Sequence, residues 1–179
     1  MKKKNNRSKF IIRGIIPFII AASLYNFVWN EFVVNPTAQD VLEKEDGKQI
    51  VLQNIDDKRT LGIMKIQNGY YAYALSDGFW GWTVTDKVYL PKATNKEKVS
   101  AIHDTLIFKR NKELDVILIS SLNNKISYFE AYDGAGKEVI FDTNRERKYE
   151  LHYGYSEESL PNELTIDGYS SDDKVLYRE

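Results

Sequence analysis

The sequence predicts a mainly β protein of the α+β class, preceded by an N-terminal transmembrane helix. Three observations support this prediction. Residues 10–34 form one long apolar run. Most of the remaining chain consists of short segments rich in β-branched and aromatic residues, separated by turn dipeptides. Only one short segment, at about 37–45, has a clear amphipathic helical pattern.

The apolar run FIIRGIIPFIIAASLYNFVWNEFVV is long enough to cross a bilayer, which takes about 20 mostly apolar residues. It holds one basic residue, Arg13, near its N-terminal end, and the next basic residue is Lys44. The first nine residues are rich in lysine and arginine, and segments with an excess of these residues stay on the cytoplasmic side of a membrane. We therefore expect a cytoplasmic tail at 1–9, an anchor in the lipid bilayer at 10–34, and an extracytoplasmic remainder.

A cleaved signal peptide is the alternative interpretation of the same segment. Ala21, Ala22 and Ser23 would serve as a small-residue cleavage site. The apolar character continues through Phe27 and Trp29, however, beyond the roughly 7–15 residues of a signal-peptide core. We expect a retained single-pass anchor, with a secreted chain as the alternative localisation.

The segment after the anchor begins with a helix signal. Thr37 is a typical N-cap residue, and Asp40 follows three positions later, where its carboxylate faces free backbone amides. Gly47 is a natural stop. One apolar stripe results, formed by Ala38, Val41 and Leu42. This pattern predicts a short amphipathic helix that packs on the first sheet.

Residues 60–85 predict an antiparallel meander. Asn68-Gly69 and Asp77-Gly78 are strong hairpin signals, and a further strand is expected at 48–54. A two-residue turn at Asp77-Gly78 would place Tyr73 opposite Trp82. Alternation then gives one aromatic face and one face of small residues. The predicted aromatic face contains Met64, Ile66, Tyr71, Tyr73, Leu75, Trp80, Trp82 and Val84.

Large apolar faces are normally buried, so we interpret the aromatic face as core. The alternative is a surface that binds a sugar ring or a partner protein. The residues that would contact a ligand in that case are Tyr70, Phe79 and Trp80. The region 35–91 is thus predicted to be a helix plus a three- to four-stranded antiparallel meander.

Pro91 and the polar run 92–98 mark a boundary, and residues 99–179 form a second β-rich region. Its short strands suggest a β-sandwich-like or rolled sheet, either separate from the first region or part of one domain with it. Asn123-Asn124 is expected to be a hairpin turn. The predicted strands lie at about 104–110, 114–122, 126–132, 138–141, 149–155 and 163–169.

Composition argues against several kinds of chemistry. The chain has no cysteine, which excludes disulfides, thiol catalysis and cysteine-bound metals. The net charge of −1 gives no overall attraction to nucleic acid. His103 and His152 are the only histidines and are far apart in sequence. Three acidic residues near the C-terminus do not match a calcium loop and are interpreted as solvated turn residues: Asp167, Asp172 and Asp173. We assign no catalytic, cofactor or metal residue.

The segment TLGIMKIQNGYYAYALSDGFWGWTV, at 60–84, carries a loose resemblance. Together with the anchor and the short helix, it resembles uncharacterised small single-pass extracytoplasmic proteins of Gram-positive bacteria. Gly81-Trp82 is its sharpest element. The resemblance implies an extracytoplasmic β-rich region and implies no catalytic residue.

The sequence therefore predicts a membrane-anchored, extracytoplasmic β-rich module with a non-enzymatic role in interaction or sensing. Its expected partners are a cell-surface protein or a wall glycan. A protein that binds cell-wall carbohydrate or peptidoglycan is the first alternative. A wall-active hydrolase that uses a carboxylate pair is the second.

Overall fold

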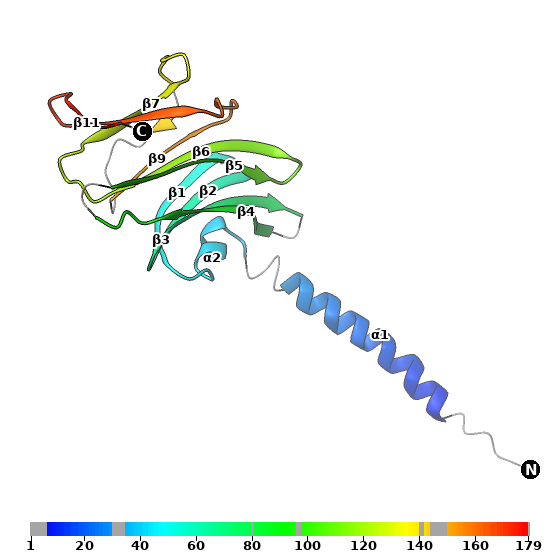
Figure 1. The fold of residues 1–179 in the computed structure, drawn as a ribbon. Helices are drawn as coiled ribbons and strands as arrows, with labels where there is room; N and C mark the ends of the chain where they lie inside the picture. The colour runs from blue at the N-terminus through cyan, green and yellow to red at the C-terminus, as the bar shows by residue number, and fades with distance from the viewer. Residues whose placement is uncertain are drawn as a thin grey trace, which may run out of the picture.

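The computed structural model describes residues 7–29, 35–79, 81–95, 98–139, 142–143 and 150–178, with side chains of the first helix described from Ile16. These residues form a β body of antiparallel sheets, one short helix packed on it and one long helix extending away from it (Figure 1). The mainly β, antiparallel prediction is confirmed.

The first sheet, sheet A, is a four-stranded meander in chain order. Every neighbouring pair is antiparallel, as the turn dipeptides predicted. Its strands are β1 (Lys48–Asp56), β2 (Arg59–Ile66), β3 (Gly69–Gly78) and β4 (Gly81–Pro91).

The rest of the body consists of two further sheets. Sheet B has the order β5-β6-β9-β8, and sheet C has the order β11-β10-β7. The strands of sheet B are β5 (Val99–Phe108), β6 (Lys112–Ser121), β8 (Asp142–Thr143) and β9 (Leu151–Ser156). The strands of sheet C are β7 (Tyr128–Asp133), β10 (Leu164–Tyr169) and β11 (Val175–Arg178).

The main core lies between sheets A and B. Small side chains of β3, Ala72 and Ala74, pack in it with Leu61 and Ile63 of β2. Sheet B contributes large side chains to the same core: Leu106, Phe108, Leu114, Val116, Leu118, Leu151 and Tyr153. Residues of the regions 35–91 and 99–179 therefore share one core. A smaller core joins the other face of sheet B to sheet C through Ile117, Ile119, Ala131, Leu160 and Ile166.

Helix α2 (Ala38–Leu42) covers part of the outer face of sheet A. Its capping box is the predicted one: Asp40 N–H donates to Thr37 Oγ1 at 3.2 Å, and Thr37 N–H donates to Asp40 Oδ2 at 3.0 Å. The fully buried Leu42 rests on Gly62, where an added Cβ would lie 2.6 Å from Leu42 Cδ1. The aromatic face is thus covered by the helix over Met64, Tyr73 and Leu75 and stays partly open elsewhere.

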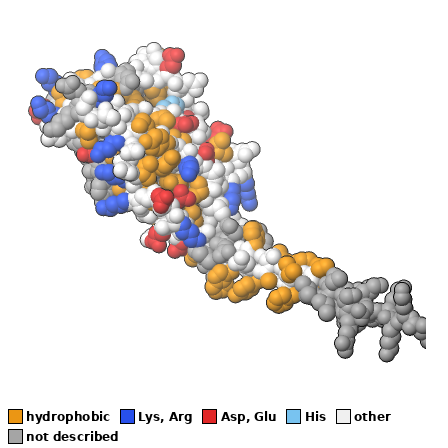
Figure 2. Space-filling model, turned by 60° about the horizontal axis from the view of Figure 1, so that its bottom comes forward, with side chains coloured by type: hydrophobic (Ala, Val, Ile, Leu, Met, Phe, Trp, Pro, Cys, Tyr) orange, Lys and Arg blue, Asp and Glu red, His pale blue; other side chains and the backbone are white. Residues whose placement is uncertain are grey.

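Helix α1 (Arg7–Val28) is 22 residues long and includes Pro17. Its apolar side chains lie at the surface (Figure 2), with Phe18 73% and Tyr25 67% exposed. Within the described residues, no helix combines the length and the apolar character needed to cross a membrane.

The predicted hairpin registers were wrong: the β3–β4 pairing next to the turn is shifted by four residues and the β2–β3 pairing by two. Asp77 and Gly78 remain in the sheet, paired with Trp82 and Gly81, so the turn comes after Gly78. The backbone N–H of Asp77 donates to the carbonyl of Lys58 at 2.9 Å, which holds this end of β3 in the sheet. A bulge follows Ala74, and Tyr73 faces Lys87 instead of Trp82.

The β2–β3 hairpin shows a smaller shift, of two residues, with Met64 opposite Tyr71 rather than Tyr73. A shift by an even number of residues leaves every side chain on its predicted face, because side chains alternate with period two. The predicted aromatic and small-residue faces are therefore retained for these strands.

The predicted hairpin at Asn123-Asn124 was also wrong. Strand β6 pairs with β5 and β9, so neither of its edges is free for β7, which pairs with β10 in sheet C. Of the strand expected at 138–141, Glu138 forms only an isolated bridge with Tyr132, and residues 140–141 lie outside the described residues. Strand β11 was not predicted.

Replacing Leu118 with Ala tests the main core. Leu118 is 0% exposed, so its truncation is expected to lower the free energy of unfolding by about 2–5 kcal/mol. The matched control is Leu52→Ala on β1, where the side chain is 37% exposed and a loss under about 1 kcal/mol is expected. Urea denaturation monitored by tryptophan fluorescence measures both. Equal losses would contradict this assignment of the core.

Candidate functional site

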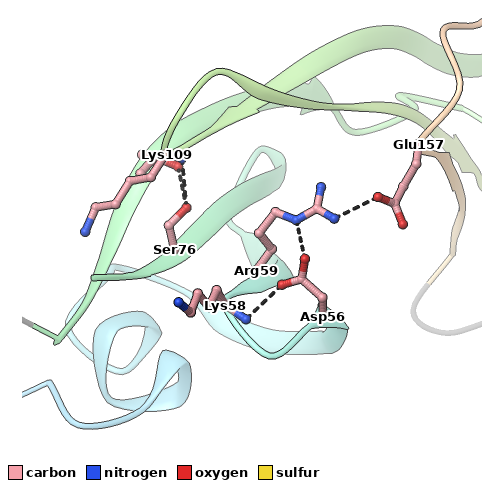
Figure 3. Close-up of polar contacts among 7 residues, drawn as sticks. Asp56, Lys58, Arg59, Ser76, Lys109 and Glu157 are labelled. Atoms are coloured by element: carbon pink, nitrogen blue, oxygen red, sulfur yellow. Dashed lines mark hydrogen bonds and ion pairs between the residues drawn. The ribbon is translucent and has the colours of Figure 1, made fainter. Parts of the chain in front are cut away.

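Three turns meet at one end of the body and enclose an open cleft of about 890 Å³. They join β1 to β2, β3 to β4 and β5 to β6. Two contacts connect them: Asp77 N–H donates to the Lys58 carbonyl at 2.9 Å, and Lys109 N–H donates to Ser76 Oγ at 3.1 Å. Figure 3 shows the second of these contacts. The cleft is lined by Asp56, Lys58, Arg59, Ser76, Asp77, Gly78, Phe79, Lys109, Arg110 and Lys112.

One of the basic side chains in the cleft is neutralised. Arg59 Nε lies 2.7 Å from Asp56 Oδ2, and Arg59 Nη2 lies 2.7 Å from Glu157 Oε2 (Figure 3). The hydrogen bond to Glu157 is the main cause that raises the pKa of Arg59. Asp56 also accepts the backbone N–H of Lys58 at 2.8 Å, and this bond, together with Arg59, lowers the pKa of Asp56. The carboxylates of Asp56 and Glu157 are therefore both paired with Arg59.

Four basic side chains remain without an ion pair among the described residues: Lys58, Lys109, Arg110 and Lys112. Only Asp77 among the lining residues is left to offset them. In Figure 3 the amino groups of Lys58 and Lys109 extend to the same side, away from the Arg59–Glu157 pair. The cleft is therefore a concentration of positive charge on a chain whose net charge is −1.

The Lys109 ammonium is positioned over Gly78. An added Cβ at Gly78 would lie 2.5 Å from Lys109 Nζ, so a side chain at position 78 would displace the ammonium from this place. The adjacent β5–β6 turn places Arg110 at φ 65° and Asn111 at φ 53°. Asparagine tolerates this left-handed conformation, but for an arginine it costs about 1–2 kcal/mol. An arginine at a position that favours glycine or asparagine points to a role for its side chain.

The three aromatic residues proposed from sequence have different positions. Phe79 is 83% exposed at the rim of the cleft. Tyr70 is 0% exposed within the main core, so its proposed contact with a ligand is wrong: its side chain points to the small-residue face, which sheet B covers. Trp80 lies outside the described residues.

Sequence reasoning missed the basic residues of the cleft. Lys58 is far in sequence from the other three, Lys109, Arg110 and Lys112, which lie together in the run KRNK. The available signals were this short basic run and the position of both groups at or beside the ends of predicted strands. Only the packing of sheet A on sheet B shows that these turns share one end of the body.

A second polar cluster occupies the outer face of sheet C. Asp167 is 1% exposed and accepts two hydrogen bonds from the guanidinium of Arg178, one of them at 2.7 Å. Tyr132 and Tyr169 share a hydrogen bond of 2.9 Å between their hydroxyls. A hydrogen bond to Asp173 raises the pKa of Tyr128 to about 12. The polar groups of this cluster are satisfied by one another, which indicates a structural role.

This cluster corrects the sequence interpretation of Asp167 as a solvated turn residue, because Asp167 is buried in β10 and paired with Arg178. Asp172 and Asp173 are exposed at a turn, and Asp173 accepts a hydrogen bond of 2.7 Å from Tyr128. Within the described residues, no group of three or more histidine or acidic side chains is arranged to hold a metal ion.

The histidines lie between sheets B and C. His103 Nε2 is 3.6 Å from Asp115 Oδ2, and Asp115 also accepts Thr105 Oγ1–H at 2.6 Å and Leu160 N–H at 2.7 Å. The hydrogen bond from Leu160 N–H to Asp115 therefore links the loop before β10 to sheet B. His152 packs edge-on against Phe129, with ring centroids 4.9 Å apart.

Comparison with protein-family models, with curated proteins and with solved structures gives no match to this chain. The geometry and charge of the cleft are therefore the observations that bear on function.

The Asp167–Arg178 pair predicts a defined pH dependence of stability. Arg178 lowers the folded-state pKa of Asp167 below its usual 3.8. A lowered folded-state pKa stabilises the fold fully above about pH 4, and this stabilisation is lost as the pH falls through the lowered value. Asp167→Asn is expected to cost about 1–3 kcal/mol at neutral pH and to weaken the pH dependence below about pH 4.

Urea denaturation between about pH 7 and about pH 3 measures both effects. Asp172→Asn, at an exposed turn position, is the control and should leave the profile unchanged. A profile for Asp167→Asn that overlays the unmodified chain would contradict the structural role of the pair.

Proposed function

We propose that this chain is a single-pass, membrane-anchored module whose β body lies outside the cytoplasm and binds a polyanionic ligand without enzymatic chemistry. The observation that carries the proposal is the basic cleft, which is lined by an exposed phenylalanine and by four cationic side chains without an ion pair among the described residues. Such groups exchange weakly bound counterions for the charges of a polyanion.

The apolar run 10–34 supports the anchor, because it contains about the 20 mostly apolar residues that a bilayer span requires. The described large apolar side chains of α1 are 50% exposed or more from Ile16 to Phe27, as lipid-facing side chains would be: Ile16, Phe18, Ile19, Ile20, Leu24, Tyr25 and Phe27. The basic residues before the run support an outward-facing body.

A wall carbohydrate or peptidoglycan is the second candidate ligand. Phe79 favours it, because an exposed ring beside polar side chains is a common surface for stacking a sugar. The burial of Tyr70 removes one of the three rings that this alternative used. A wall polymer that also carries phosphate or carboxylate groups would fit the basic cleft better than a neutral glycan.

Cell fractionation tests the anchor and its orientation. A C-terminally tagged full chain should sediment with membranes, and external protease added to wall-stripped cells should remove the tag. A shortened product in the medium would indicate cleavage near Ala22 and Ser23 and would replace the anchored protein with a secreted one. A membrane-bound tag that protease cannot reach would contradict the proposed orientation.

Charge reversal tests the cleft. The variant Lys58→Glu/Lys109→Glu is expected to bind inorganic polyphosphate about 30-fold more weakly or worse, at about 1 kcal/mol per basic residue lost. Lys125→Glu/Lys174→Glu is the matched control, because both lysines are exposed, lie outside the cleft and change the net charge equally. Titrations with polyphosphate at several salt concentrations measure the affinity and its dependence on salt concentration. Equal weakening in both variants would mean that net charge, not the cleft, governs binding.

A further inference from the structure

The chain enters the β body next to the cleft. The first described residue after Trp29 is Asn35, and its carbonyl accepts the backbone N–H of Trp82 at 3.2 Å. The Lys44 ammonium also donates a hydrogen bond to the side-chain oxygen of Asn35. Trp82 is paired with Asp77, which lines the cleft. The entry point of the chain and the basic cleft therefore share the start of β4.

This placement limits how far the cleft can be from the membrane exit. Six peptide units separate Trp29 from Asn35, so they span at most about 20 Å. Strand β6 starts at the cleft with Lys112 and runs ten residues away from it, which puts Ser121 about 30 Å farther off. Figure 1 shows the β3–β4 turn at the end of the body that lies toward α1. The cleft end is thus the end that the tether keeps close to the bilayer.

We infer that the polyanion bound by the cleft is the surface of the same membrane that holds α1, through the phosphate groups of its anionic phospholipids. The inference rests on the proposed function and names the ligand of its site. Lysine and arginine near an anionic bilayer each contribute an affinity gain of about fivefold. The guanidinium of Arg110 matches a phosphate group in shape, and the lysines add point charges.

Phe79 gives the cleft a second means of contact with lipid. Its ring is 83% exposed at the rim, beside the basic side chains. An aromatic ring flanked by lysine and arginine is suited to the headgroup boundary, where the ring enters the apolar side and the charges remain with the phosphates. The opposite end of the sheets, where β6 ends near Ser121, would then point away from the membrane.

Distance to the lipid surface tests the inference directly. The chain contains no cysteine, so one introduced cysteine accepts a fluorophore without background labelling. Asp57→Cys places the label on the β1–β2 turn at the cleft, and Asn124→Cys places it beyond the far end of β6. The full chain is reconstituted in nanodiscs of phosphatidylcholine, with or without phosphatidylglycerol, that carry a headgroup quencher.

Quenching of the label in the Asp57→Cys chain is expected to rise when phosphatidylglycerol is present and to fall again at high salt. The label in the Asn124→Cys chain should be quenched little in either lipid. Adding Lys58→Glu/Lys109→Glu to the Asp57→Cys chain should shift the docking equilibrium by about 25-fold toward the free body. The Lys125→Glu/Lys174→Glu pair should leave the equilibrium unchanged. Excess polyphosphate should release the label of the Asp57→Cys chain from the lipid surface.

The outcomes separate this inference from the proposed function. The Asp57→Cys chain could enter nanodiscs and bind polyphosphate through the cleft while its label is quenched equally with and without phosphatidylglycerol. That result would overturn the lipid ligand and leave the proposed function standing. Stronger quenching in the Asn124→Cys chain than in the Asp57→Cys chain overturns the placement of the cleft. A chain that fails to enter nanodiscs overturns the anchor and, with it, both proposals.

Discussion

The packing of β3 against sheet B is the constraint on which the rest of the structure depends. Ala72 and Ala74 present little side-chain volume, so the two sheets approach each other and large side chains of β6 fill the space between them. This contact joins the regions on either side of Pro91 into one core. It also brings the ends of three hairpins, distant in sequence, to one end of the body.

The electrostatics of the cleft follow from that arrangement. Arg59 is neutralised twice, by Asp56 on its own hairpin and by Glu157 from the chain after β9. No described acidic side chain does the same for the lysines and the arginine at the tips of the other turns. Repulsion among like charges opposes this gathering, and two backbone contacts hold the turns together: Asp77 to Lys58 and Lys109 to Ser76. The fold thus brings Lys58, from the β1–β2 turn, to the basic run 109–112 of the β5–β6 turn.

Local structure was predictable from the sequence where its determinants are local. The capping box of Thr37 and Asp40, the meander and the two faces of β3 depend on spacing and alternation alone. Turn positions were less predictable, because Asp77 stays in the sheet through a contact with Lys58 that is made only in the folded body. The same limit applies to the partner of β7 and to the burial of Tyr70, since each depends on which sheet covers which face.

The proposed membrane tether would change the affinity that the basic cleft needs. Four basic side chains at about 1 kcal/mol each would give a free body only about millimolar affinity for an anionic surface. A short tether presents that surface at an effective concentration also on the order of millimolar. Docked and free orientations of the body would then be of similar population. Salt, lipid charge or a competing wall polyanion would shift the balance with a small change in free energy, which is the property expected of a sensing module.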